Sequence, residues 1–256
     1  MKILITMLTI LTFTASLVHA LQEPEDSLIL YQSFDTIDGK NTVDHSKYEN
    51  HGEIKGNPKH VDGQFGKALE FNGSSDWIEI PHEEILTVEK EVTVMAWIHT
   101  ERHQGPGGAR WQGILSKSNN PRSYSFYTES PSECLHLSAG GGSVCEGKVE
   151  LNEWQHVVGQ VDNGTHRYWI NGKSVGEYGG KNPLPGTADT SVVYIGTTGE
   201  GASRLFLGMI DEVRIWNRAL SEEEVIEQME KGHFELFPVD PRHKVATTWG
   251  TLKTQK

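Results

Sequence analysis

The acidic and nucleophilic side chains of this chain form none of the familiar catalytic patterns. Two acids that act on one bond must project from the same face of a strand, whereas the adjacent Asp211 and Glu212 point to opposite faces. The acids at 222–224 precede an apolar helical pattern and suit the positive end of a helix. The sequence contains no Gly-x-Ser-x-Gly, His-Glu-x-x-His or phosphate-binding loop motif. We therefore expect no catalytic residues and a protein that is not an enzyme.

Sugar binding is a second chemistry, and it depends on exposed aromatic rings and planar polar groups. Several such side chains lie in or beside segments rich in glycine and polar residues, which favours exposure: Arg110, Trp111, Tyr124, Tyr127 and Tyr178. The alternative for each is ordinary partial burial under a loop. Other tryptophans lie in apolar strand-like segments, which favours a place in the core: Trp77, Trp97, Trp154, Trp169 and Trp216.

The two cysteines can form a covalent cross-link. Cys134 and Cys145 flank the apolar Leu135 and Leu137 and a glycine turn at 140–142, the pattern of a β-hairpin. We predict a disulfide across this hairpin rather than two free thiols, because residues 1–20 have the pattern of a secretory signal and both cysteines follow it. Closing so short a loop contributes about 3 kcal/mol in the chain-entropy description. No Cys-x-x-C spacing suggests a redox centre.

The elements that must position these residues are clearest at 208–224. This segment begins as a strand with period-2 alternation and then changes to a helical pattern predicted over 222–231. Ser221 and Glu224 have the spacing of a capping box at its start, and Gly232 supplies a stop.

The rest of the chain reads as β-structure. Short apolar or alternating runs recur roughly every 8–12 residues between turn signals, which favours two antiparallel sheets in a sandwich. The predicted strands are 28–34, a short one around 53–54, 68–71, 77–80, 92–100, 114–117, 123–128, the 134–145 hairpin, 155–161, 166–170, 174–178, 192–196 and 205–213. The predicted fold class is therefore all-β, with one short helix near the C-terminus.

An ordered series of blocks carries a family resemblance. The blocks are Ser33-Phe34-Asp35, 66–73, 93–98, 114–117, 154–157, 168–172 and the Ile-Asp-Glu-Val-Arg-Ile-Trp strand with Asn-Arg-Ala-Leu-Ser and the acidic helix. Together they resemble laminin-G-like, concanavalin A-like jelly-roll domains of the pentraxin-related type, over about 28–232. The resemblance implies that the first and last strands are neighbours.

The same resemblance implies a structural calcium ion. Its ligands would be Asp35, the carbonyl of Gly73 and Asp211, since calcium takes carboxylate and carbonyl oxygens. The alternative is that Asp35 and Asp211 only accept hydrogen bonds from backbone amides at strand ends.

Composition and the chain ends indicate the compartment. Residues 1–20 have the pattern of a secretory signal, with a membrane anchor as the alternative. The sequence contains no second long apolar run, so we expect no membrane span once the signal is removed. We expect a spacer at 21–27, the jelly-roll domain at 28–232 and a C-terminal extension at 233–256. The formal charge of −12 argues against a nucleic-acid partner.

These observations together predict a secreted protein, extracellular or periplasmic, that acts as a non-catalytic binding module. The expected partner is a glycan at a cell surface or in a matrix, by analogy of fold. An extracellular protein partner or a structural role is the alternative. A divergent glycoside hydrolase is a third, less favoured, class.

Overall fold

Antiparallel strands make up most of the chain in the computed structural model, which describes residues 25–117, 122–140, 142–179, 184, 186, 189–199 and 202–236. These residues belong to one compact unit, Glu23–Pro238. The expected signal segment at 1–20, the start of the spacer and residues 237–256 of the expected extension lie outside the described residues.

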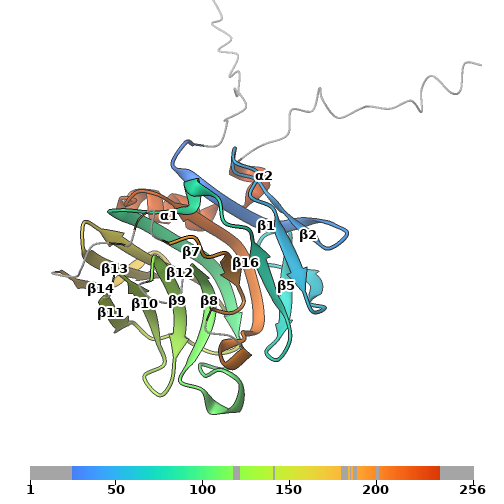
Figure 1. Ribbon diagram of the computed structural model, residues 1–256. Helices are drawn as coiled ribbons and strands as arrows, with labels where there is room; N and C mark the ends of the chain where they lie inside the picture. Colours follow the sequence, from blue (N-terminus) through green and yellow to red (C-terminus); the bar gives the residue numbers. More distant parts are fainter. Residues whose placement is uncertain are drawn as a thin grey trace, which may run out of the picture. The chain divides into compact units, whose positions relative to one another are not determined.

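The strands form two layers (Figure 1). In hydrogen-bonding order, the first layer is β11 (Gly142–Glu146), β10 (Cys134–Ala139), β9 (Tyr124–Glu129), β8 (Trp111–Lys117), β15 (Val193–Ile195), β6 (Trp77–Ile80) and β3 (Gly52–Lys55). The second is β1 (Leu28–Asp38), β16 (Leu207–Trp216), β7 (Glu91–Thr100), β12 (Trp154–Asp162), β13 (Thr165–Ile170) and β14 (Lys173–Tyr178), with β5 (Lys67–Asn72) also paired to β16 and β4 (Lys59–Asp62) to β5.

The two layers are continuous rather than separate. Strand β2 (Asn41–Asp44) pairs with β1 on one side and with β3 on the other, so one hydrogen-bonded path runs through both layers. The predicted neighbourhood of the first and last strands is confirmed, because β1 and β16 are antiparallel with Leu30 opposite Ile215 and Gln32 opposite Val213. Short helical turns η1 (Glu84–Leu86), η2 (Pro106–Gly108) and η4 (Ala202–Arg204) lie between strands.

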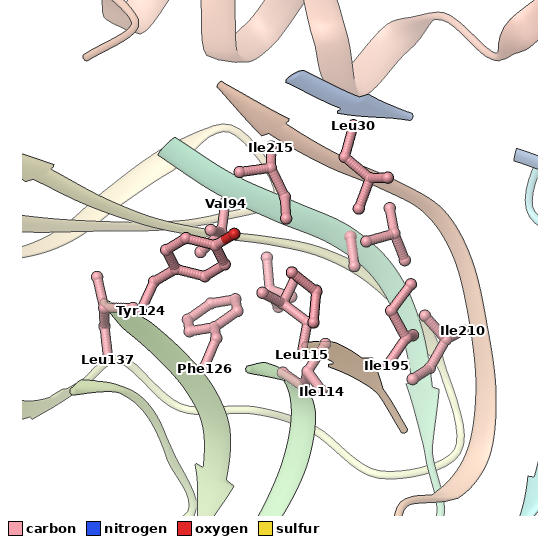
Figure 2. Close-up of a cluster of buried hydrophobic side chains, with 14 of the residues drawn as sticks. Leu30, Val94, Ile114, Leu115, Tyr124, Phe126, Leu137, Ile195, Ile210 and Ile215 are labelled. Atoms are coloured by element: carbon pink, nitrogen blue, oxygen red, sulfur yellow. The ribbon is translucent and has the colours of Figure 1, made fainter. Parts of the chain in front are cut away.

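The apolar core fills the space between the layers. Figure 2 shows Tyr124, Phe126 and Leu137 of β9 and β10 directed towards Val94 and Ile215 of β7 and β16. Burial of these side chains stabilises the sandwich by about 25 cal/mol for each Å² of apolar surface removed from water. The predicted core position is right for Trp169 and Trp216, but Trp77, Trp97 and Trp154 are only half-buried.

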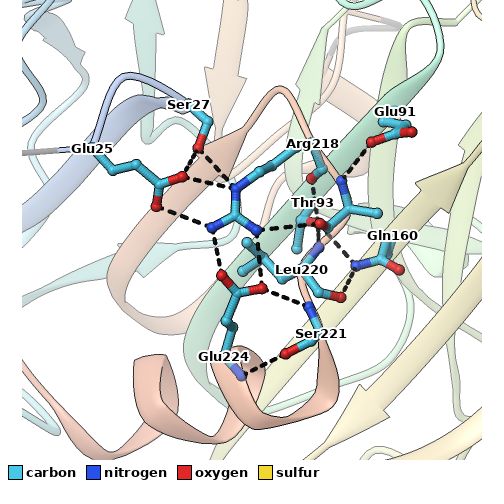
Figure 3. Close-up of polar contacts among 10 residues, drawn as sticks. Glu25, Ser27, Glu91, Thr93, Gln160, Arg218, Leu220, Ser221 and Glu224 are labelled. Carbon is cyan, nitrogen blue, oxygen red and sulfur yellow. Dashed lines mark hydrogen bonds and ion pairs between the residues drawn. The ribbon is translucent and has the colours of Figure 1, made fainter.

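The strand-to-helix junction has the predicted local chemistry. Helix α1 (Glu222–Glu230) begins with the capping box: Ser221 Oγ accepts from the Glu224 N–H at 3.2 Å, and Glu224 Oε2 accepts from the Ser221 N–H at 2.8 Å. Arg218 then joins this junction to the start of the chain through ion pairs with Glu224 at 2.6 Å and Glu25 at 2.8 Å (Figure 3).

A second short helix follows, α2 (His233–Leu236), within the expected C-terminal extension. The His233 ring lies 3.8 Å from the His45 ring, centroid to centroid, and packs edge-on against Tyr31 of β1. The first residues of the extension therefore pack on the sandwich.

Two short connections between successive strands differ in what they join. The disulfide Cys134–Cys145 is present and links β10 to β11, as predicted. By contrast, β5 and β6 are successive strands that do not pair with each other, because β5 pairs with β16 and β6 with β3 and β15. The turn between them therefore crosses from one layer to the other, and Asp76 holds it by accepting the Asn72 N–H at 3.1 Å.

Candidate functional site

The outward face of β8, β9 and β10 gathers the polar and aromatic groups of the candidate site. Side chains alternate along a strand, so Tyr124 and Phe126 point into the core while Tyr127 and Glu129 point away from it. Strand pairing places Glu129 opposite Trp111 on β8 and Tyr127 opposite His136 on β10. Three neighbouring strands therefore bring these side chains together.

Glu129 is the polar centre of this group. Both Nε and Nη2 of Arg110 donate to its Oε1, with Nε at 2.8 Å, and Trp111 Nε1 donates to Oε2 at 3.2 Å. His136 Nδ1 also hydrogen-bonds Oε2. Both carboxylate oxygens thus accept hydrogen bonds that orient an arginine and a tryptophan.

Guanidinium groups lie against the aromatic rings. Arg204 of η4 has its Cζ 4.6 Å from the centre of the Trp111 ring and 5.3 Å from that of Tyr127, and Arg110 lies 5.2 Å from Trp111. The His136 ring packs edge-on against both Trp111 and Tyr127. We call Arg110, Trp111, Tyr127, Glu129, His136 and Arg204 the aromatic–arginine cluster.

The electrostatics of the aromatic–arginine cluster favour a charged carboxylate and a neutral imidazole. Burial acts to raise the pKa of Glu129, but hydrogen bonds from Arg110 and His136 outweigh it and the pKa is lowered. Burial lowers the pKa of His136, and its hydrogen bond to Glu129 only partly opposes this. Because burial dominates, we take His136 as neutral at pH 7, with the proton on Nδ1. Two arginines and one carboxylate leave the cluster locally positive on an acidic chain.

The predicted ligand-binding residues divide into two groups. Arg110, Trp111 and Tyr127 come together in the aromatic–arginine cluster, and the Arg110 side chain remains 57% exposed. Tyr124 does not, because it is completely buried in the core and its hydroxyl donates to the Leu86 carbonyl at 3.1 Å. Tyr178 lies apart on β14, where it hydrogen-bonds Glu146.

Sequence reasoning missed Glu129, His136 and Arg204. Alternation along the strand could have found Glu129, which lies two residues from Tyr127 and so shares its face. No local signal identifies Arg204, because it reaches Trp111 only through the fold.

The predicted metal ligands Asp35 and Asp211 approach one loop, at 63–66. Asp211 Oδ2 accepts the Phe65 N–H at 3.0 Å, and Asp35 Oδ1 accepts the Lys67 N–H at 2.9 Å. The loop passes so close that a Cβ on Gly66 would lie 1.9 Å from Asp35 Oδ1. Each aspartate therefore makes the backbone hydrogen bond that the alternative interpretation expected.

Gly73 does not join these two aspartates. The β5–β16 register pairs Asn72 with Leu207 and Leu69 with Ile210, so Gly73 lies beyond the opposite end of this pairing from Asp211. Its carbonyl accepts from Arg102 Nη2 at 2.9 Å. The loop at 63–66, rather than Gly73, is the segment that lies beside both aspartates.

The chemistry of the loop site suits a hard cation. Asp211 is completely buried, and its Oδ1 has no hydrogen-bond partner among the described residues. Burial, reinforced by the neighbouring charge of Glu212, raises the pKa of Asp211 to about 8. A cation bound by these carboxylates and by loop carbonyls would displace the proton from Asp211 and stabilise its ionised form. A second acidic group, Glu129 with His136 and Cys145, does not suit a metal because Cys145 is in the disulfide.

The layered antiparallel strands and the neighbouring first and last strands define a two-layer β-sandwich of the jelly-roll class. A family model described as the concanavalin A-like lectin/glucanases superfamily matches residues 72–226, and the chain belongs to this superfamily. A search among curated proteins found no match.

Solved structures with the same fold come from several kinds of protein. Domain 4 of the GH43 extracellular arabinanase AbnA from Geobacillus stearothermophilus, in complex with arabinotriose, is 22% identical with a TM-score of 0.64, covering 79% of this chain and 98% of that one. The binding domain of Paraclostridial mosquitocidal protein 1 is 17% identical with a TM-score of 0.63, over 80% of this chain and 52% of that one.

Trypanosoma rangeli sialidase, in complex with the inhibitor DANA, is 16% identical with a TM-score of 0.58. The match covers 80% of this chain and only 33% of the sialidase chain. At such identities the likeness concerns the fold alone, and the site must carry any functional argument.

Proposed function

We propose that this protein is a non-catalytic glycan-binding module and that the aromatic–arginine cluster contacts the sugar. The observation that carries the proposal is the fixed orientation of Trp111: its indole N–H is held by Glu129 and its ring lies against Arg110 and Arg204. A preoriented aromatic ring binds the C–H face of a sugar with little loss of side-chain entropy, and guanidinium N–H groups donate to hydroxyl or carboxylate oxygens. The arabinotriose in the arabinanase domain supports a saccharide ligand for the fold.

Binding accounts for this cluster better than hydrolysis does. A glycosidase needs two carboxyl groups across one bond, one of which carries a proton. Within the aromatic–arginine cluster Glu129 is the one carboxylate, both of its oxygens accept hydrogen bonds, and its pKa is lowered. Release of reducing ends from a polysaccharide, abolished by Glu129→Gln, would favour the hydrolase instead.

A glycan array tests the binding proposal. We expect Trp111→Ala to weaken binding at least about ten-fold, because the loss of a stacking ring costs on the order of 1.4 kcal/mol. Tyr178→Ala is the matched control, since Tyr178 is an exposed aromatic residue, 43% accessible, on β14 of the other layer. Wild-type protein that binds no sugar, while it captures a protein ligand, would favour the alternative of a protein-interaction module.

A protein partner has less support from the surface. Among the described residues the large apolar side chains with high exposure are Leu151, Tyr178 and Ile226, which lie in a loop, on β14 and on α1. Scattered apolar side chains are normal on a monomeric protein and do not form a docking patch.

We also propose a structural calcium ion held by Asp35 and Asp211 with backbone carbonyl oxygens of the loop at 63–66. The unpartnered Asp211 Oδ1 and the close approach of the loop support this ligand set. When bound, the ion would join β1, β16 and this loop and hold Asp211 in its ionised form.

Thermal unfolding tests the calcium proposal. We expect calcium at a hundred times its dissociation constant to raise the free energy of unfolding by about 2.7 kcal/mol. The melting temperature should therefore be higher in calcium than in chelator. Asp211→Asn should abolish the calcium response, whereas Asp62→Asn, at a carboxylate whose side chain is 92% exposed on β4, should retain it. An unchanged melting temperature of the wild type would contradict the proposal.

Export of the protein remains part of the proposed function. The Cys134–Cys145 disulfide supports an oxidising compartment, where such bonds persist. No helix in the described part of the chain combines the length and hydropathy required to cross a bilayer.

A further inference from the structure

A pocket lined by none of the residues of the aromatic–arginine cluster lies beside it on the outward face of the same layer, at β6 and β15. It has a volume of about 260 Å³ and is lined mainly by Trp77, Glu79, Tyr194, Thr197 and Leu205. Neither the sequence motifs nor the aromatic–arginine cluster accounts for it. Its size is below the roughly 300–1,000 Å³ of pockets for drug-sized ligands, which suits one small ring.

Alternation along two paired strands directs the lining side chains into this pocket. Trp77 and Glu79 are two residues apart on β6 and share the outward face, while Ile78 and Ile80 are completely buried in the core. Tyr194 on β15 is the direct cross-strand partner of Glu79. The pocket therefore presents two half-buried aromatic rings beside one carboxylate.

A hydrogen bond orients the Trp77 ring, and a lysine lies near the Glu79 carboxylate. Trp77 Nε1 donates to Glu79 Oε1 at 2.9 Å, which fixes the indole ring. Lys55 Nζ, on the neighbouring strand β3, lies 3.5 Å from Glu79 Oε2. Lys55 Nζ also lies 2.8 Å from Glu53, so it only partly offsets the charge of Glu79 and the pocket does not suit an anionic ligand.

Thr197 supplies an unused polar group. Its side chain is 4% exposed, and its hydroxyl has no hydrogen-bond partner among the described residues. A buried hydroxyl without a partner destabilises the folded protein, and a hydrogen bond from a ligand hydroxyl removes that cost.

The pocket is contiguous with the aromatic–arginine cluster. Leu205 lines the pocket, and the preceding residue, Arg204, lies over Trp111 and Tyr127. On the β8 side, a Cβ placed on Gly113 would lie 2.6 Å from the Thr197 carbonyl carbon, and Gly113 is the strand partner of Tyr127. One extended ligand can therefore cover both.

We propose that this pocket is a second subsite, which binds one neutral sugar ring of a glycan whose adjoining residues contact the aromatic–arginine cluster. The inference rests on the proposed function. Trp77 and Tyr194 contact the C–H faces of the ring, Glu79 accepts hydrogen bonds from its hydroxyls, and Thr197 pairs with a further hydroxyl. A chain of several sugars therefore binds more tightly than a single sugar.

Titration calorimetry of the full chain with neutral sugars tests this inference. The probes are arabinose, xylose and glucose as single sugars and as oligosaccharides of increasing length. We expect affinity to rise with length, and Trp77→Ala to weaken oligosaccharide binding about ten-fold, as expected for loss of a stacking ring. Thr197→Val keeps the side-chain shape, should fold normally because its hydroxyl has no partner, and should bind several-fold more weakly.

The outcomes separate the pocket from the proposed function. Weaker binding in Trp111→Ala with unchanged binding in Trp77→Ala and Thr197→Val overturns the subsite and leaves the proposed function standing. Weaker binding in Trp77→Ala and Thr197→Val with unchanged binding in Trp111→Ala supports the subsite and overturns the assignment of the cluster. Failure of the wild type to bind any of these probes overturns both. If Trp77→Ala does not fold, Thr197→Val decides the question.

Discussion

Replacing Arg214 with methionine will lower the free energy of unfolding by about 3–5 kcal/mol, the cost of removing one partner from a buried ion pair. Arg214 on β16 is 1% exposed and pairs with Glu212. Its guanidinium also donates to Gln228 O at 2.6 Å and Lys231 O at 2.7 Å, at the end of α1, and lies 4.5 Å from the Tyr31 ring centre. Methionine fills much of the volume but leaves these acceptors and the Glu212 carboxylate without their donor.

Urea unfolding at pH 7 measures this loss, with Arg167→Met as the matched control. Arg167 forms ion pairs with Asp162 at 2.7 Å and Glu177 at 2.8 Å, but its side chain is 29% exposed. We expect the control to lose less than about 1 kcal/mol, because solvent screens surface pairs. The double variant Glu212→Gln/Arg214→Met should recover part of the loss. Equal losses for Arg214→Met and Arg167→Met would contradict the prediction.

Stability will fall by about 3 kcal/mol between pH 7 and pH 4 through His156 alone, as its linkage relation requires. His156 on β12 is 1% exposed, its ring packs against Trp97, and its Nδ1 has no hydrogen-bond partner among the described residues. Burial, reinforced by the positive charge of Arg214, lowers its pKa from 6.5 to about 3. The unfolded chain therefore takes up a proton at a higher pH than the folded protein, and acid favours unfolding.

The direction of the His156 effect and its pH range follow from the folded and unfolded pKa values of this residue. The contribution of His156 is fully present above its unfolded pKa of 6.5 and is lost as pH falls towards the folded value of about 3. Asp211 acts in the opposite direction without calcium, because burial raises its pKa to about 8 and protonation then stabilises the folded protein. The difference between wild type and His156→Leu, measured by urea unfolding across this range, isolates the histidine.

The expected result is a shallower loss of stability with acid in His156→Leu than in wild type. His60→Gln serves as the control, because the His60 ring is exposed and glutamine keeps a donor for the Phe34 carbonyl. Parallel pH curves for wild type and His156→Leu would show that the buried imidazole does not govern acid sensitivity.

Local chemistry was sufficient for much of the fold. The change from strand to helix near 216–222 could be predicted because Ser221 and Glu224 satisfy each other's backbone N–H groups within one turn. The Cys134–Cys145 hairpin could be predicted because the cysteine spacing and the glycine turn between them are also local features. Pairing partners were harder: β5 and β6 follow each other across a short turn at 72–76 but lie in different layers, because turn residues do not specify which strands pair.

The candidate sites show the same limit. Tyr124 and Tyr127 both follow a polar segment and looked equally suitable, yet they are three residues apart and strand alternation sends them to opposite faces. Gly66 and Gly73 both belong to the block that resembles the family, and only the β5–β16 register shows that Gly73 lies at the end of β5 away from Asp211.

The amino-acid sequence by itself determined that this chain is an all-β protein of the laminin-G-like type, with a capped helix after its last strand and a disulfide-linked hairpin. These features depend on side chains that are only a few residues apart, so they are visible in the sequence without knowledge of which distant segments pack together. Only the tertiary structure decided that Glu129, Trp111 and Arg204 meet, and that Trp77 and Tyr194 line one pocket. Those contacts join distant segments, and they exist only once strand register and the packing of the layers have fixed which faces point outward.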